Sequence, residues 1–159
     1  MSELMSAKQF LEALKSGRRN FQKITINEEV VIENTTVRGS MPCINCEDAQ
    51  IKKLTVNDNI KHLRLHGSLI ERLIVGGKIK ELLLQNATIG TLNLLKSKIT
   101  LLYLSGITIT KDLLFSELKI DEVNCGDNLG LAWFLHLQGQ KVITNYKAVE
   151  SLFSSLISK

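Results

Sequence analysis

An internal repeat of about ten residues constrains the fold of this chain more than any other feature. Isoleucine recurs at intervals of nine to eleven residues through the middle of the chain. These isoleucines are Ile51, Ile60, Ile70, Ile79, Ile89, Ile99, Ile109 and Ile120. Most of them begin the phrase I-x-x-L-x-(L/V), as in IKKLTV, IKHLRL, IERLIV, IKELLL, IGTLNL and ITLLYL. Because so short a unit cannot bury its own apolar face, we expect the units to stack as a repeat protein.

The spacing of the apolar residues predicts strands rather than helices. A helix would place apolar residues at i, i+3, i+4 and i+7, whereas here they fall at offsets 0, 3, 5 and often 8 of each unit. Pairs two residues apart have the spacing of a strand. From Leu84 to Ile109 the apolar anchors are five residues apart. The segment 21–125 therefore predicts an all-β solenoid of about five coils, each made of about four such short units.

The repeat resembles that of the pentapeptide-repeat proteins. Their unit has a small residue at one inward position and Leu or Phe two residues later, and 68–70, 87–89 and 97–99 fit this pattern. The segment FLEALKSG followed by RRNFQKITI is similar to the usual lead-in to the first coil. The resemblance implies a right-handed quadrilateral β-helix and a divergent member, because alternate small positions hold leucine and single residues are deleted near 56–60 and 75–79. The leucines are Leu63, Leu73, Leu82, Leu92 and Leu102.

Two other repeat folds share part of this pattern. A generic β-solenoid fits the same apolar spacing without the quadrilateral form. A leucine-rich-repeat horseshoe shares the L-x-x-L-x-L phrase, but its repeat needs 20–29 residues, twice the spacing here. We expect one domain over residues 1–159.

Both ends of the solenoid need covering, because terminal coils have unpaired strand groups. At the N-terminus, Ser6 and Gln9 have the spacing of a capping box, and Gly17 is a plausible helix stop. This pattern predicts a capping helix over 6–17. At the C-terminus, 129–158 contains the single tryptophan, Trp133, and predicts a helical cap. Its last helix could instead form a dimer through Val149, Leu152, Phe153 and Leu156.

The cysteines and histidines do not predict a metal or redox site. Cys43 and Cys46 form one C-x-x-C, but zinc usually takes four ligands, and Cys125 is about 80 residues away. We expect Cys46 and Cys125 to be small core residues. The three histidines, His62, His66 and His136, have no ligand spacing. We therefore expect no metal and no cofactor.

The sequence also lacks a catalytic constellation. It has no G-x-S-x-G, P-loop, dinucleotide-binding or H-E-x-x-H motif. His62 and His66 flank Arg64 on an outward face, which we expect to be solvated, with a phosphate patch left open. We expect His136 to be partly buried, and Gly76 and Gly77 to form a corner. The chain is expected not to be an enzyme.

Charge limits the choice of partner. The formal net charge is +4 and the pI about 9.0, with nine basic and three acidic residues between 51 and 98. DNA mimicry, which the family resemblance suggests, needs a strongly negative surface and is disfavoured. Nucleic-acid or anionic-surface binding is the opposite hypothesis, disfavoured because stacking aromatics are lacking and Glu71 and Glu81 interrupt the band. Its footprint would be Lys52, Lys53, Lys61, Arg64, Arg72, Lys78 and Lys80.

An exposed apolar column gives the sharpest functional prediction. If Ile60, Ile79 and Ile99 stack, then Arg64, Leu83 and Tyr103 also stack, with Leu101 beside them. Contiguous exposed apolar area indicates an interaction site, unless a terminal helix covers it. The sequence thus predicts a scaffold or interaction module that binds a protein partner or a second copy through Leu83, Leu101, Tyr103 and Arg64.

The compartment is predicted only broadly. No apolar run approaches the ~20 residues of a membrane span, and the first residues lack the order of a signal peptide. We expect a cytoplasmic protein. Secretion as a signal-less bacterial effector is left open on the family resemblance alone.

Overall fold

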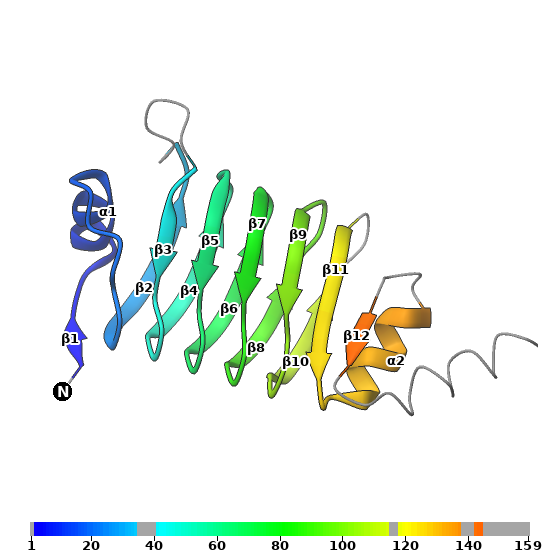
Figure 1. Cartoon of the computed structure of the whole chain (residues 1–159). Helices are drawn as coiled ribbons and strands as arrows, with labels where there is room; N and C mark the ends of the chain where they lie inside the picture. Colours follow the sequence, from blue (N-terminus) through cyan, green and yellow to red (C-terminus); the bar gives the residue numbers. More distant parts are fainter. Residues whose placement is uncertain (1, 35–40, 115–117, 138–141, 145–159) are drawn as a thin grey trace, which may run out of the picture.

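The computed structural model describes residues 2–34, 41–114, 118–137 and 142–144, and over these it is a parallel β-solenoid (Figure 1). Sheet A has the strand order β1-β2-β4-β6-β8-β10, and sheet B the order β12-β11-β9-β7-β5-β3. Sheet A contains β1 (Glu3–Leu4), β2 (Ile24–Ile32), β4 (Gln50–Val56), β6 (Leu69–Val75), β8 (Thr88–Asn93) and β10 (Thr108–Leu114). Sheet B contains β3 (Cys43–Asn45), β5 (Ile60–Arg64), β7 (Lys78–Leu83), β9 (Lys98–Tyr103), β11 (Lys119–Gly126) and β12 (Val142–Thr144).

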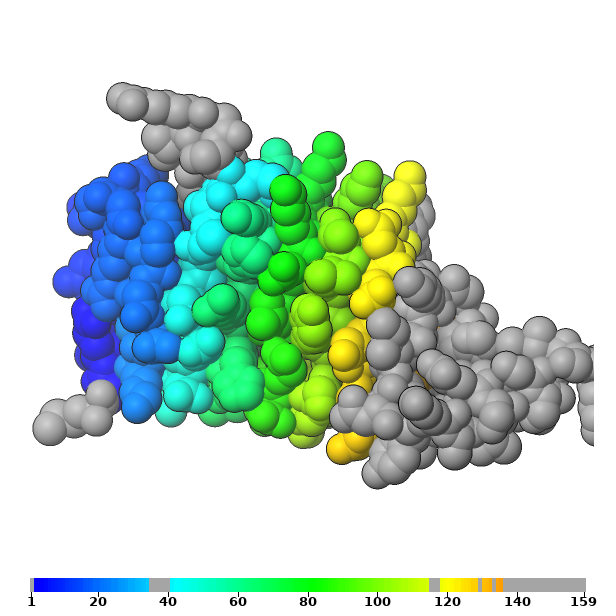
Figure 2. Space-filling model, in the orientation of Figure 1, coloured from blue at the N-terminus to red at the C-terminus, as the bar shows by residue number. Residues whose placement is uncertain are grey.

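The isoleucine repeat sets the register between coils. The chain alternates between the sheets, so each coil contributes one strand to each, and Figure 2 shows the coils as successive bands of colour. In sheet A, Ile51, Ile70, Ile89 and Ile109 pair in one row. In sheet B, Ile60, Ile79, Ile99 and Ile120 do the same. The predicted solenoid is confirmed, with about six turns rather than five, because short strands extend both sheets at their ends.

The core between the sheets is aliphatic. Inward side chains such as Leu73, Leu82 and Leu92 are fully buried. Where a serine takes an inward position, its hydroxyl donates to a carbonyl three residues back, from Ser68 to Leu65 (2.7 Å) and from Ser97 to Leu94 (2.9 Å). These local hydrogen bonds remove the cost of burying a hydroxyl.

Buried and exposed side chains do not alternate strictly along the strands of sheet B. In β7 and β9 two successive residues in mid-strand are not buried, as at Lys80 and Glu81, before inward burial resumes. The chain turns at corners where one residue in each coil has a positive φ, among them Asp48, Gly67 and Asn86. The predicted corner at Gly76 and Gly77 lies between β6 and β7.

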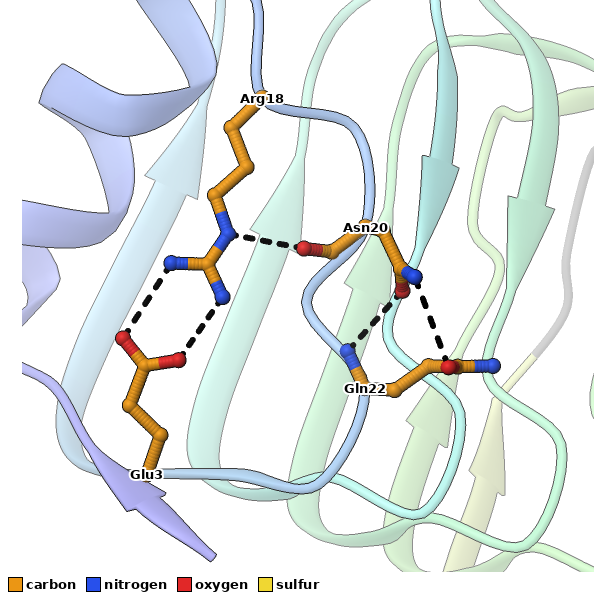
Figure 3. A network of polar contacts seen from close by, with 4 residues as sticks. All are labelled: Glu3, Arg18, Asn20 and Gln22. Carbon is orange, nitrogen blue, oxygen red and sulfur yellow. Dashed lines mark hydrogen bonds and ion pairs between the residues drawn. The ribbon is translucent and has the colours of Figure 1, made fainter.

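The N-terminal segment packs on the first coil. Helix α1 (Ala7–Lys15) begins at the capping box formed by Ser6 and Gln9. Its Phe10 is buried against Phe21, with ring centroids 4.3 Å apart. Strand β1 precedes the helix and was not expected from the sequence. The two carboxylate oxygens of its Glu3 accept hydrogen bonds from Nη1 (3.2 Å) and Nη2 (2.8 Å) of Arg18 (Figure 3).

The C-terminal segment differs from the prediction of a helical cap over 129–158. Helix α2 (Leu129–Leu137) is followed by β12, which pairs in parallel with β11. Its residues Val142, Ile143 and Thr144 are β-branched and favour a strand. The predicted dimer helix with Val149, Leu152, Phe153 and Leu156 lies outside the described residues. Within the described part of the chain, no helix has the length and hydropathy to cross a membrane.

Candidate interaction surface

Two columns of side chains run along the outer face of sheet B, one residue from each coil. The first column contains Cys43, His62, Glu81, Leu101 and Glu122. The second column contains Asn45, Arg64, Leu83, Tyr103 and Asn124. The register predicted from the sequence for both columns is confirmed over the three coils from β5 to β9.

Three neighbouring side chains in these columns, Leu83, Leu101 and Tyr103, form what we call the apolar patch. All three are half-buried, because neighbouring strands flank them on the sheet. They are less exposed than the sequence suggested, and the most exposed large apolar side chains lie elsewhere, for example Leu69 in sheet A at 52% exposure. What distinguishes the patch is contiguity: Leu83 pairs directly with Tyr103, and Leu101 is two residues before Tyr103 on the same strand.

The charge on the two columns changes along the solenoid axis. The positive charge of Arg64 on β5 lies on the N-terminal side of the apolar patch. On the C-terminal side, Glu122 of β11 pairs in register with Leu101. Between these ends, Glu81 Oε2 lies 2.7 Å from His62 Nδ1. The patch thus has a positive flank and a negative flank.

A pocket of about 300 Å³ opens at the positive flank. It is lined by the N-terminal part of both columns together with the connection between α1 and β2. The lining residues are Arg19, Asn20, Cys43, Ile44, Asn45, His62 and Arg64. Arg19 is fixed by hydrogen bonds from Nη1 to the carbonyls of Leu14 (2.6 Å) and Arg18 (3.2 Å).

A third column at the start of the sheet B strands consists of lysines. Lys78, Lys98 and Lys119 pair in register on β7, β9 and β11, and all three are exposed. The basic footprint predicted from the sequence contains Lys78 but not Lys98 or Lys119, although each of the three precedes a repeat isoleucine. Like charges directly opposite one another repel, so this lysine column favours an anionic neighbour.

The basic footprint predicted from the sequence is not one surface. Lys52, Lys53 and Arg72 belong to sheet A. The other members, Lys61, Arg64, Lys78 and Lys80, belong to sheet B. Lys53 also pairs with Glu29 at 2.6 Å. A net charge summed over a sequence segment does not describe one face of the solenoid, because alternate strands lie in different sheets.

The C-x-x-C motif is divided between surface and core. Cys43 is exposed, whereas Cys46 and Cys125 are buried as expected, and all three are free thiols. Burial raises the pKa of Cys46 to about 12 and that of Cys125 to about 11, so these two thiols stay protonated. His66 is exposed. The side chain of His136 lies outside the described part of the chain. Among the residues described, no group of three His, Cys, Asp or Glu could hold a metal ion.

The fold defines a β-solenoid repeat protein. Comparison with protein-family models, curated proteins and solved structures gives no match. Function must therefore be argued from these surfaces.

Proposed function

We propose that this protein is a non-enzymatic protein–protein interaction module that uses the outer face of sheet B, and that a second copy of the chain is the occupant. The observation that carries the proposal is the pairing of Leu83 with Tyr103, with Leu101 beside them. A tyrosine among aliphatic side chains is typical of the centre of an interface, where an apolar body and a polar hydroxyl are both used.

The charges on either side of the apolar patch support a second copy. A copy turned end for end, with its strands parallel to those of the first, brings Leu83 opposite Tyr103 of the second copy. The same rotation brings the positive flank at Arg64 toward the negative flank at Glu122. Unlike charges then lie near one another at both ends of the apolar centre, which favours association through the two columns. The lysine columns of the two copies face one another in the same register, which weakens the association.

The size of the face predicts a concentration-dependent dimer. Six strands at ~4.8 Å spacing and at most about six residues at ~3.3 Å give an upper limit of roughly 29 by 20 Å, or about 600 Å², for the face. That is below the ~800 Å² that each partner buries in a standard stable interface. We therefore expect the dimer to dissociate on dilution.

The proposal is tested with the double variant Leu83→Glu/Tyr103→Glu, measured by light scattering after size exclusion. Four buried carboxylates per dimer would repel one another, so we expect a monomer with unchanged circular dichroism. Leu69→Glu is the matched control, because it adds a carboxylate at an exposed leucine of sheet A. If the double variant still dimerises, the second copy does not bind through this face. If Leu69→Glu lowers the mass equally, the effect of the double substitution is not specific to this face.

The lysine column supports a second function, binding of a nucleic-acid backbone. Lys78, Lys98 and Lys119 repeat at the ~4.8 Å spacing of the strands and form a continuous positive line. Fluorescence anisotropy with a labelled DNA duplex at low salt tests it. Binding that weakens with salt and with Lys98→Glu supports this function, whereas no binding at low salt rejects it.

We also propose that the coil has the right-handed quadrilateral form of the pentapeptide-repeat proteins. The two successive unburied residues in mid-strand, such as Lys80 and Glu81, support a bend that divides each strand between two sides of a square. A crystal structure tests this form: four flat sides per coil support it, and two continuous flat sheets contradict it.

A further inference from the structure

A thiol, an imidazole and a carboxylate stand in one row at the N-terminal end of the first column. Cys43 on β3 pairs in register with His62 on β5, and His62 pairs with Glu81 on β7. Neighbouring strands are ~4.8 Å apart, so the three residues are neighbours across the sheet, with His62 in the middle. This is the order nucleophile, base and orienting group that activates cysteines.

The contact between Glu81 and His62 fixes the state of the imidazole. Glu81 Oε2 lies 2.7 Å from Nδ1 of His62. An ionised carboxylate can only accept a hydrogen bond, so Nδ1 carries a proton, and the lone pair of the ring in its neutral form is on Nε2. Nε2 is therefore the nitrogen that can take a proton from a neighbouring thiol.

The pocket beside this row suits a small anion. Its volume of about 300 Å³ is at the lower end of the ~300–1,000 Å³ found for small-molecule sites. Arg19 and Arg64 line it together with Cys43 and His62. Arginine is well suited to bind carboxylates. The reactive thiol and the anion-binding groups thus share one cavity.

We propose that Cys43 is a reactive thiol that exchanges with anionic low-molecular-mass disulfides, with His62 as the base and Arg64 and Arg19 as the groups that bind the anion. The thiol proton passes to Nε2 of His62, and the thiolate sulfur attacks one sulfur of the disulfide. A new S–S bond to Cys43 forms while the S–S bond of the reagent breaks. The departing thiolate takes the proton, so Cys43 is oxidised and half of the reagent is reduced.

The proposal is specific to one of the three cysteines. Cys46 and Cys125 are buried in the core and cannot meet a reagent while the chain is folded. The charged and titratable groups around His62 are Cys43 on β3, Glu81 on β7 and the two arginines of the pocket.

The first experiment incubates the folded protein with oxidised glutathione and follows the mass and the modified peptide by mass spectrometry. We expect one glutathionyl group per chain, on Cys43, and none in Cys43→Ser. Reaction at Cys46 or Cys125, or no reaction at Cys43, overturns the proposal. The reaction is measured at a protein concentration at which light scattering shows a monomer, because the proposed dimer would cover Cys43 and His62 on the outer face of sheet B. The result then does not depend on whether the protein dimerises.

The second experiment tests the base by measuring the rate with oxidised glutathione against pH. We expect His62→Gln to lower the rate at pH 7 about tenfold and to change the shape of the pH profile, because the thiol then lacks its base. Glu81→Leu should change the rate and the profile in the same way but by less, because Glu81 only positions the imidazole. Identical profiles for the wild type and His62→Gln overturn the role of His62.

The third experiment tests recognition of the anion. Arg64→Gln should slow the reaction with oxidised glutathione several-fold and leave the reaction with neutral 2-hydroxyethyl disulfide unchanged. Arg72→Gln is the matched control, since it removes the same charge from sheet A, and should change neither rate. Equal slowing of both reagents by Arg64→Gln overturns the anion site.

Discussion

Leu83 on β7 lies directly opposite Tyr103 on β9, on the outer face of sheet B. Their immediate neighbours along the chain, Leu82 and Leu102, form the corresponding pair on the inner side. Because every coil repeats this arrangement, one of two adjacent residues packs in the core between the sheets and the next faces outward. The surface chemistry can therefore be changed without altering the core.

Substitution of adjacent leucines should distinguish the core position from the outward one. Leu82→Ala removes a fully buried side chain and should lower the free energy of unfolding by about 2–5 kcal/mol. Leu83→Ala removes a half-buried side chain and should cost less than about 1.5 kcal/mol. Urea unfolding followed by circular dichroism measures both. Equal losses would contradict the assigned register.

The close stacking of the coils should make Gly90 intolerant of a side chain. A Cβ at this position would collide with the backbone carbonyl of Glu71 on the previous coil. We expect Gly90→Ala to destabilise the fold by about 1–3 kcal/mol, as overpacking does. Gly130→Ala is the control, because its Cβ meets open space in α2 and alanine favours a helix by up to ~1 kcal/mol. We predict that Gly90→Ala lowers the midpoint of thermal unfolding and that Gly130→Ala raises it. A Gly90→Ala variant with an unchanged midpoint would be inconsistent with this packing.

The hydroxyl of Thr55 offers a stabilising substitution. It is buried and finds no hydrogen-bond partner among the described residues. Thr55→Val should therefore raise the free energy of unfolding by about 1 kcal/mol. Ser97→Ala, which removes a hydroxyl that is hydrogen-bonded to Leu94, should not stabilise. If Thr55→Val lowers the unfolding midpoint, the hydroxyl has a partner that this account omits.

The contact between β1 and the start of the first coil should depend on pH. A hydrogen bond from Arg18 lowers the pKa of Glu3 below its ordinary value of 4.5. A carboxylate with a lowered pKa stabilises the fold above that ordinary value, and this contribution is lost as the pH falls through the lowered one. Glu3→Gln should therefore unfold at most a few degrees below the wild type at pH 7.

Below the lowered pKa of Glu3 the difference between Glu3→Gln and the wild type should vanish. Glu12→Gln is the control, because Glu12 makes only an exposed ion pair with Lys8 at 3.9 Å. A difference that persists in acid would show that the carboxylate charge is not responsible.

The sequence predicted the repeat and the rows because both follow from residue spacing. A five-residue unit determines which side chain stacks on which, so the pairing of Arg64 with Leu83, and of Leu83 with Tyr103, could be inferred without coordinates. The capping box at Ser6 and Gln9 is likewise a local pattern.

The remaining features depend on pairings that the repeat does not contain. Strands β1 and β12 are two and three residues long and add to the sheets outside the periodic segment, so no period predicts them. The row of Cys43, His62 and Glu81 was missed because Cys43 precedes the first repeat isoleucine, and its register with His62 appears only once β3 is paired with β5.

The central claim is that the outer face of sheet B binds a second copy of the chain. The most direct measurement is the solution mass of the wild-type protein by size exclusion with light scattering, across a tenfold range of concentration. A dimer formed through this face predicts a mass that approaches twice 17.8 kDa at the highest concentration and falls toward 17.8 kDa on dilution. A mass of 17.8 kDa at every concentration would contradict it.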